Sequence, residues 1–387
     1  EAQNDRQAYY RALLGYTSSI PDGHVWLEGD DFDAREAAVG AGFGLEVLAL
    51  DDGRVIAVKI TPGGPAEGAG VHWGAEILTW NGQPVRQALD QTPVVWPLRR
   101  GAPATLEGRR LEQLRLLVRA PAGAMASVSF RNPDGAEIQQ AALTAVYDGA
   151  VAQNGDAESF LPPVEPGVIL PGDIGYIKIN NEHEGTDAHP EEVFRDAVRA
   201  FMDAQVTGVI LDVRGNRGGD DRLVPQFVGY FFEQRELYEK VSLYFQPLNT
   251  FIHRPPVLWI DPLEPYYDGP VVVLVDNATF SSGEGIPLAV SRLPQGAVIG
   301  FNGTYGSFGM TGGNIILPEG LTLHFPDGQS LDRGGQIQLD SSSTLQGGVA
   351  PTIRVPMTEE AAKAVFLNHE DFLLDYAVQY LQDSIQP

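Results

Sequence analysis

The sequence predicts a mixed α/β protein in which a β-rich module precedes a larger domain built on a parallel sheet. From about residue 41, short apolar runs alternate with turns rich in Gly and Pro, which is typical of a small antiparallel sheet. From about residue 174, strand-like runs alternate with helix-like segments, which favours βαβ units. A chain of 387 residues is long enough for two or three such domains.

The first segment, residues 1–38, is predicted to be helical and to end in a turn. Tyr9, Leu13 and Leu14 have helical spacing, and the Pro-Asp-Gly turn at residues 21–23 ends the helix. His24 follows directly on a loop. Because no packing pattern explains a polar side chain there, His24 is a candidate functional residue and general base.

The β-rich module is predicted over residues 39–147. Its strand-like runs are GFGLEVLAL, RVIAVKI, AEILTWNGQPV and ASVSFRNPDGAEIQQAALTA. An Arg-rich stretch with regularly spaced leucines interrupts the series, and we interpret it as an amphipathic helix with a solvated basic face. Residues 148–168 are polar and contain prolines, so we expect a linker.

The larger domain is predicted over residues 169–387. Its strand-like runs are IGYIKIN, TGVILDVRG, VVVLVD and AVIGF, and helix-like segments separate them. In a parallel sheet of this kind, ligands bind beyond the carboxyl ends of the strands. The last segment begins at Thr358, a good N-cap residue, and its apolar periodicity indicates a helix that only packs.

Ser281 follows VVVLVD in the stretch DNATFSSGEG and has two interpretations. With Glu284 it has the S-x-x-E spacing of a capping box, in which each side chain accepts a backbone N–H. Alternatively, a Ser at a strand-to-helix turn stands at the edge of the sheet, where it can act as a nucleophile. The segment alone favours the cap.

A second loop at a strand end, LDVRGNRGGDD, bears on that choice. Its glycines let the backbone approach a ligand closely and leave N–H groups free to donate. If the two strands are neighbours in one sheet, the amides of Gly218 and Gly219 lie beside Ser281 and offer the paired donors that an oxyanion hole needs.

Composition excludes several functions. Acidic residues outnumber basic ones by 51 to 26, and a net charge of -25 repels nucleic acid and anionic membranes. The absence of Cys excludes thiol chemistry, and no apolar run is long enough to span a bilayer. The start of the chain lacks the features of a signal peptide, so either the protein is cytoplasmic or a targeting segment has been removed. The run NNEHEGTDAHPEE lacks the HExxH spacing of a metal site, and we expect no metal.

Part of the β-rich module resembles PDZ domains. GAGFGLEV is similar to their carboxylate-binding loop, and GGPAEGAGVHWGAEILTWNGQPV follows their order of turn, short helix, strand and turn. The resemblance implies that Phe43, Gly44 and Leu45 bind the C-terminus of a polypeptide. Ala75 stands where the family usually has an acidic residue, which alters a turn without removing the groove.

The order of motifs over nearly the whole chain resembles the C-terminal processing and tricorn-type serine peptidases. These motifs are DGH, the PDZ-like module, GVILDVRGNRGG, VVLVDNATFSSGEG, VIGFNGTYGS and GGVAPTIRVP. The resemblance implies a crotonase-like (β-β-α) core, a Ser281 nucleophile, and an oxyanion hole formed by the amides of Ser282 and of Gly218 or Gly219. It also implies an extracytoplasmic location.

The two branches of this family use different residues as the general base. The processing branch has a lysine after its T-[YF]-G motif, whereas this chain has Ser307 there. The tricorn-like branch uses a histidine from the N-terminal segment, which corresponds to His24. That branch also has a glutamate where this chain has Leu345, so the resemblance leaves the third member open: Gln346, Glu284, an unplaced residue, or a simple Ser–His dyad.

The sequence therefore predicts a serine endopeptidase that needs no metal or cofactor, captures polypeptide tails with its PDZ-like module and hydrolyses peptide bonds. The main alternative is a protein of the same fold that binds peptides or apolar ligands without turnover, and Leu345 is its best support. An adaptor that uses the larger domain only as a scaffold is a further alternative.

Overall fold

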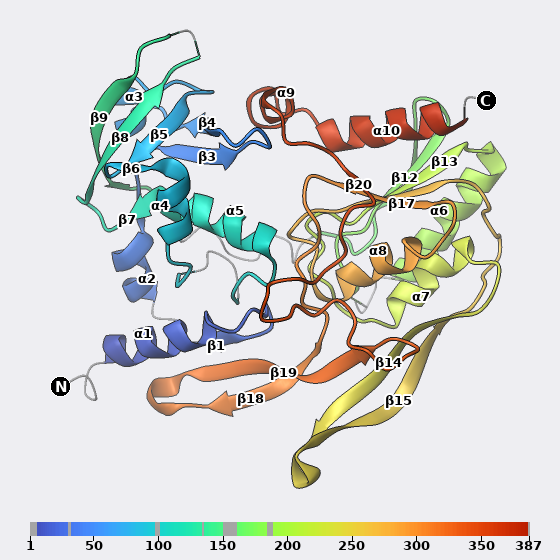
Figure 1. Cartoon of the computed structure of the whole chain (residues 1–387). Coiled ribbons are helices and arrows are strands. Elements are labelled where there is room, and N and C mark those ends of the chain that lie inside the picture. The colour runs from blue at the N-terminus through green and yellow to red at the C-terminus, as the bar shows by residue number, and fades with distance from the viewer. Residues whose placement is uncertain are drawn as a thin grey trace.

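The computed structural model describes residues 6–29, 32–96, 101–133, 135–149, 161–183 and 189–385. Two parts are visible in Figure 1: a β-rich unit formed by the first third of the chain, and a larger domain beside it. Three predicted regions lie wholly or partly outside the described residues. They are most of the linker, the start of the Arg-rich stretch, and Glu184 and Asp187 of the run in which we expect no metal.

The larger domain is built on the predicted parallel sheet. Its strands lie in the order β11-β12-β13-β16-β17-β20, and only β11 is antiparallel to its neighbour. Their bounds are β11 (Val168–Leu170), β12 (Ile174–Lys178), β13 (Gly208–Asp212), β16 (Val271–Leu274), β17 (Gly296–Gly300) and β20 (Ile353–Arg354). Because β13 and β16 are neighbours, the loops that follow them meet at one edge of the sheet.

Helices cover both faces of this sheet, which explains why its strands are continuous apolar runs. Val209 and Leu211 pack under the helices of one face, whereas Ile210 between them packs under the helix of the other face. The first face carries α6 (Pro190–Ala204), α7 (Leu223–Val228), η3 (Gly229–Phe231) and α8 (Gly285–Val290), and the second carries α10 (Phe372–Ile385).

A second, antiparallel sheet was not predicted from the sequence. It has the order β1-β19-β14-β15, with β18 also paired to β19, and its β14–β15 hairpin extends away from the core in Figure 1. Its strands are β1 (Trp26–Glu28), β14 (Glu236–Phe245), β15 (Thr250–Ile260), β18 (Met310–Ile316) and β19 (Thr322–Leu331), with turns η4 (Gln246–Leu248) and η6 (Pro318–Gly320). The pairing of β1 with β19 ties the N-terminal segment to the larger domain.

The β-rich unit has the strands that its sequence predicts, in the order β3-β4-β5-β8-β9 with β6 beside β5. They are β3 (Leu45–Ala49), β4 (Val55–Ile60), β5 (Glu76–Trp80), β6 (Gln83–Pro84), β8 (Met125–Arg131) and β9 (Gln139–Thr144), and a small sheet adds β2 (Ala41–Gly42), β7 (Arg119–Ala120) and β10 (Val146–Tyr147). Its helices are α3 (Pro65–Gly68), α4 (Val85–Gln91) and α5 (Leu106–Leu117), and α5 is the helix expected in the Arg-rich stretch.

The two ends of the chain complete the structure. Before the β-rich unit come α1 (Arg6–Thr17), which confirms the predicted helix, and α2 (Phe32–Val39). At the other end, Thr358 caps α9 (Glu359–Ala362) by accepting the Ala361 amide at 3.1 Å, as predicted. The predicted single helix is interrupted, because η7 (Lys363–Asn368) ends at His369 in a left-handed conformation before α10 starts. None of the described helices is long and apolar enough to cross a membrane.

Candidate active site

The turn after β16 holds Ser281 in a conformation that a cap does not need. Ser281 is the first residue of a single 3-10 turn, η5 (Ser281–Glu284), and its φ of 56° lies in the left-handed region that non-glycine residues rarely adopt. Phe280 occupies the N-cap position, and no side chain caps the turn. The capping-box interpretation is therefore wrong, because both side chains that would form the box are used elsewhere.

The side chain of Ser281 meets His24. The His24 Nε2 atom lies 3.1 Å from Ser281 Oγ, although the two residues are 257 positions apart in the chain. His24 is 3% exposed, and its ring lies 4.5 Å from the ring of Phe280. It stands two residues before β1, whose Trp26 pairs with His324 of β19 and stacks on its ring at 4.5 Å. The strand pairing thus brings His24 to the sheet edge.

The glycine loop after β13 packs directly against Ser281, as the neighbouring strands predict. A Cβ atom on Gly218 would lie 2.7 Å from Ser281 Cβ and 2.8 Å from the Ser282 amide nitrogen. Gly218 and Gly219 have φ values of 91° and 157°. Only glycine fits this approach without displacing the nucleophile turn.

The amides of the two loops are not equally free. The Gly218 N–H donates to Asn216 Oδ1 at 2.8 Å, and the Ser281 N–H donates to the Ser307 carbonyl at 3.2 Å. Within the described part of the chain, the Gly219 and Ser282 amides have no acceptor. Of the predicted oxyanion donors, Gly219 and Ser282 are therefore available for a ligand, whereas Gly218 is engaged.

Glu284 supports the loop that follows β17 and does not contact His24. Its carboxylate is fully buried and accepts the Thr304 hydroxyl at 2.5 Å, the Gly306 amide at 2.8 Å and the Ser307 amide at 2.9 Å. Burial raises the pKa of Glu284 to about 7, and these three donors oppose the rise. Among the described residues, Glu284 therefore makes no direct contact that orients His24.

Ser307 joins the two halves of the site. Its carbonyl accepts the Ser281 amide, and its Oγ atom accepts the Gly23 amide at 2.9 Å, next to His24. The four lysines of the chain lie elsewhere: Lys59 pairs with Glu46, Lys178 with Asp212, Lys240 donates to the Arg333 carbonyl, and Lys363 is in η7. The position where the processing branch has its lysine is thus occupied by Ser307, whose hydroxyl accepts a backbone hydrogen bond.

Two carboxylates, Asp22 and Asp340, interact electrostatically with His24 or with each other. Asp22 Oδ1 accepts the His24 backbone amide at 2.8 Å and is 3.3 Å from Nδ1, but Nδ1 is buried and the contact lacks hydrogen-bond geometry. Asp340 accepts the amides of Phe308 and Gly309. Burial raises the pKa of Asp340 to about 6; the negative charge of Asp22 adds to the rise, and His24 opposes it.

The remaining sequence candidates form hydrogen bonds with residues other than His24. Gln346 is exposed, and its carbonyl accepts the Ser342 amide in a turn. Leu345 has a φ of 59°, and its carbonyl accepts the Leu106 amide of α5. Neither residue takes the place of the family's glutamate. Among the described residues, no cluster of His, Asp and Glu side chains could hold a metal ion.

The predicted carboxylate-binding loop of the β-rich unit is partly engaged in hydrogen bonds within the protein. Phe43 and Leu45 are buried, the Phe43 amide donates to the Val118 carbonyl at 3.3 Å, and its carbonyl accepts the Ala66 amide. Gly44, with φ of 78°, packs against Pro65, and its carbonyl accepts the Thr61 amide. The open space lies at the other end of β3.

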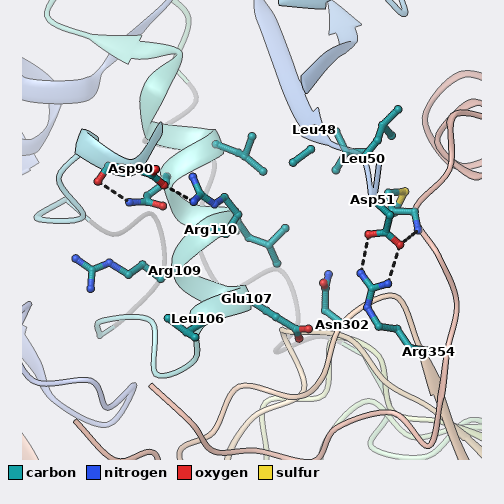
Figure 2. A pocket seen from close by; sticks show the side chains of 15 residues that line it. Leu48, Leu50, Asp51, Asp90, Leu106, Glu107, Arg109, Arg110, Asn302 and Arg354 are labelled. Atoms are coloured by element: carbon teal, nitrogen blue, oxygen red, sulfur yellow. Dashed lines mark hydrogen bonds and ion pairs between the residues drawn. The ribbon is translucent and has the colours of Figure 1, made fainter. Parts of the chain in front are cut away.

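That space is a groove of about 630 Å³ between the end of β3, α5 and the larger domain. Figure 2 shows apolar side chains of both elements along it, Leu48, Leu50 and Leu106 among them. Ion pairs lie at its margins: Arg354 with Asp51 at 2.7 and 2.8 Å, and Arg110 with Asp90.

The matches with known proteins agree with this fold. Residues 173–355 match the model of the family described as Peptidase family S41, so this part of the chain resembles a domain of that family. Ser281 and the glycine loop lie inside the matched span, and His24 lies outside it.

The chain is a homologue of carboxy-terminal processing proteases. It is 25% identical over 239 residues to the carboxy-terminal processing protease CtpB of Bacillus subtilis (strain 168). That alignment covers 60% of this chain and 42% of CtpB, so the chain spans less than half the length of this curated relative.

Solved structures share the fold over nearly the whole chain. The crystal structure of mature CPAF superposes with a TM-score of 0.64 at 16% identity and covers 98% of this chain and 89% of its own. The structure of mature CPAF complexed with lactacystin also has a TM-score of 0.64, at 14% identity, with coverages of 99% and 91%. The expected mixed α/β architecture is thus confirmed.

Several residues of the site were not singled out by the sequence. The sequence shows Asp22 as part of a turn, and its position two residues before His24 places a carboxylate close to that histidine. For Ser307, the sequence shows only that it stands where the processing branch has a lysine. Glu182, Asn216 and Asp340 left no recognisable signal, because their partners are distant in the sequence.

Proposed function

We propose that the chain is a serine endopeptidase in which Ser281 is the nucleophile and His24 the general base. One observation carries the proposal: the 3.1 Å contact between His24 Nε2 and Ser281 Oγ, with Ser281 in a left-handed turn against the glycine loop. A serine hydroxyl is too weak an acid to attack unaided near neutral pH, and a histidine at hydrogen-bond distance supplies the missing base.

The proposed reaction has two halves. Ser281 Oγ attacks the scissile carbonyl while His24 Nε2 accepts the hydroxyl proton, and the amides of Ser282 and Gly219 stabilise the resulting oxyanion. His24 then gives the proton to the leaving amine as the C–N bond breaks, which leaves an acyl group on Ser281. A water molecule attacks this ester, again with proton transfer to His24, and Ser281 leaves with the proton.

The nucleophile assignment is tested with dye-labelled unfolded casein and a fluorophosphonate probe. Wild-type protein should hydrolyse the casein and be labelled on the peptide that contains Ser281. Ser281→Ala should abolish both activities and leave the thermal midpoint nearly unchanged. A residue that only capped a helix would instead cost about 1 kcal/mol of stability and spare turnover. Binding of casein without any turnover by the wild-type protein would support the non-catalytic alternative.

We further propose that the β-rich unit is a PDZ-type module that captures polypeptide tails. Support comes from the free edge of β3 facing α5 and from the groove of about 630 Å³ between them. Because Leu48, Ala49, Leu50 and Asp51 line the groove at the far end of β3, we expect a tail to enter from that end. Arg109, which has no ion-pair partner among the described residues, also lines the groove from α5, and its positive charge can attract a terminal carboxylate.

Calorimetry with matched peptides tests this capture. A peptide with a free apolar C-terminus should bind more tightly than the same peptide with an amidated C-terminus, and Arg109→Gln should reduce the difference. Equal affinities for acid and amide peptides would mean that the groove does not read a terminus.

A further inference from the structure

A buried glutamate lies between the two loops that form the site. The Glu182 side chain has no exposed surface. Its Oε1 atom accepts a hydrogen bond from Asn216 Nδ2 at 2.7 Å, and its Oε2 atom accepts one from Ser282 Oγ at 3.1 Å. No basic side chain among the described residues forms an ion pair with it. The carboxylate therefore joins the glycine loop to the nucleophile turn by neutral donors alone.

The backbone of Glu182 holds the glycine loop as well. Its amide donates to the Gly218 carbonyl at 3.2 Å, and its carbonyl accepts the Asp220 amide at 2.6 Å. Gly219 lies between these two bonds, where a Cβ atom would be 2.2 Å from the Glu182 carbonyl oxygen. Asn216, which the carboxylate holds, fixes the Gly218 amide through its Oδ1 atom. Both chain neighbours of Gly219, Gly218 and Asp220, are thus hydrogen-bonded to the Glu182 backbone.

The other contact of the carboxylate is with Ser282, the second oxyanion donor. Ser282 is 2% exposed and immediately follows the nucleophile. Resting on the proposed function, we infer that Glu182 is the positioning residue of the oxyanion hole, and that it sets the separation of the Gly219 and Ser282 amides by holding both loops.

Energetics support a functional role for this residue. Burial raises the pKa of Glu182 to about 7, and the hydrogen bonds from Asn216 and Ser282 oppose the rise. A buried carboxylate without a cation is unfavourable for folding, so stability alone does not explain it. An ionised carboxylate accepts from Asn216 and Ser282 at once, whereas a carboxamide has a single acceptor oxygen. Amides that are fixed in advance stabilise an oxyanion without reorganisation during the reaction.

Glu182→Gln tests this inference because it keeps the size of the side chain and removes one acceptor and the charge. With dye-labelled casein, kcat should fall by about 10- to 100-fold while KM stays within about twofold, since small displacements of catalytic groups are costly. The rate of Ser281 labelling by the fluorophosphonate should fall by a similar factor, because the phosphonyl oxygen occupies the same amides. Circular dichroism should show an unchanged fold.

Glu165→Gln is the matched control. Glu165 also accepts a hydrogen bond from an asparagine, Asn180 Nδ2 at 3.1 Å, but it does not contact either loop, and kcat should stay at the wild-type value. If Glu182→Gln does not fold, Ser282→Ala removes the same contact from the other side and should lower kcat by about 3- to 10-fold with KM unchanged.

The outcomes separate this inference from the proposed function. The inference alone would be overturned if the wild-type protein turns over casein and folded Glu182→Gln has the same kcat. If Glu182→Gln does not fold, an unchanged kcat in Ser282→Ala would overturn it instead. A rise in KM at constant kcat would also overturn it, because a group that positions the oxyanion hole acts on the transition state. Absence of turnover in the wild-type protein would overturn the peptidase assignment and this inference together.

Discussion

The two sides of the site are held in different ways. The nucleophile side consists of loops that follow adjacent strands of one buried sheet, and two fully buried glutamates, Glu182 and Glu284, fasten them. The base side is a loop before the three-residue strand β1, held by the pairing of Trp26 and its neighbours with β19, by Asp22 and by Ser307. The proposed nucleophile thus lies on loops that follow strands of the buried sheet, whereas the proposed base lies on a segment held by strand pairing and a few hydrogen bonds, and we expect the base side to be the easier one to displace.

The largest expected effect is loss of the base itself. His24→Ala should lower kcat by about 10²–10⁴-fold, the usual contribution of general-base assistance, and should leave the fold intact. His253→Ala, which removes an exposed histidine of β15, is the matched control and should retain wild-type turnover. The rates are measured with dye-labelled casein. Full activity of His24→Ala would show that the docked side is not needed for chemistry.

A smaller effect is expected when the carboxylate beside the base loses its charge. Asn at position 22 can still accept the His24 backbone amide, so Asp22→Asn keeps the turn and removes only the negative charge 3.3 Å from Nδ1. We expect kcat to fall by about tenfold with KM unchanged, because an oriented imidazolium is less well stabilised.

Asp22→Ala removes the turn contact as well and separates the two roles of the side chain. It should lower the thermal midpoint in addition to kcat. If Asp22→Asn has the wild-type kcat, Asp22 is only a turn residue, and the site works as a Ser–His dyad.

Weakening the docking strand should have a still smaller effect. Trp26→Ala removes the ring that stacks on His324 at 4.5 Å, so β1 should pair less firmly and kcat/KM should fall by about 3- to 10-fold. Trp259→Ala is the control, since Trp259 lies in the same sheet on β15, where it contacts Arg235 and no part of the site. Equal activity of the two variants would contradict the idea that the pairing of β1 with β19 holds the base side in place.

The smallest effect is a pH dependence of the free energy of unfolding. It arises from buried glutamates, including the two that hold the nucleophile side. Burial raises the pKa values of Glu182, Glu239 and Glu284 to about 7, from 4.5. The folded state therefore holds these protons more tightly than the unfolded state, and the free energy of unfolding should fall as pH rises from about 5 to about 7. Below 4.5 both states are protonated, and this contribution vanishes.

Thermal midpoints in buffers between pH 5 and pH 8 measure this slope. Glu239→Gln should make it shallower, because Glu239 is buried, accepts the Ser330 hydroxyl and is not part of the site. The exposed Glu360 serves as the control, and Glu360→Gln should leave the slope unchanged. A midpoint that rises steadily with pH over this range would contradict the raised pKa values.

The sequence predicted the nucleophile side better because that side is local. Apolar runs before residues 213 and 276 marked the two strands, and the glycines marked the loop between β13 and α7. The second sheet was missed in part because β15 contains Pro255 and Pro256, which cannot donate to a strand partner; the structure places this strand at the sheet edge, where prolines are tolerated.

The capping box was mispredicted for a different physical reason. The S-x-x-E spacing of Ser281 and Glu284 is real, but Glu284 finds three donors in residues 304–307, which no local pattern shows. The partners of Glu182 are equally distant, since Asn216 and Ser282 lie 34 and 100 residues further along the chain. Contacts of this range depend on the strand order, which periodicity does not determine.

The left-handed backbone of Ser281 also limits which nucleophiles could replace it. A branched β-carbon is poorly tolerated at positive φ, so a threonine would have to strain the turn or leave it, even though its hydroxyl has the same chemistry. A cysteine has the unbranched shape of serine and would fit. The choice between the three hydroxyl and thiol nucleophiles is therefore decided at this turn by backbone geometry before reactivity is considered.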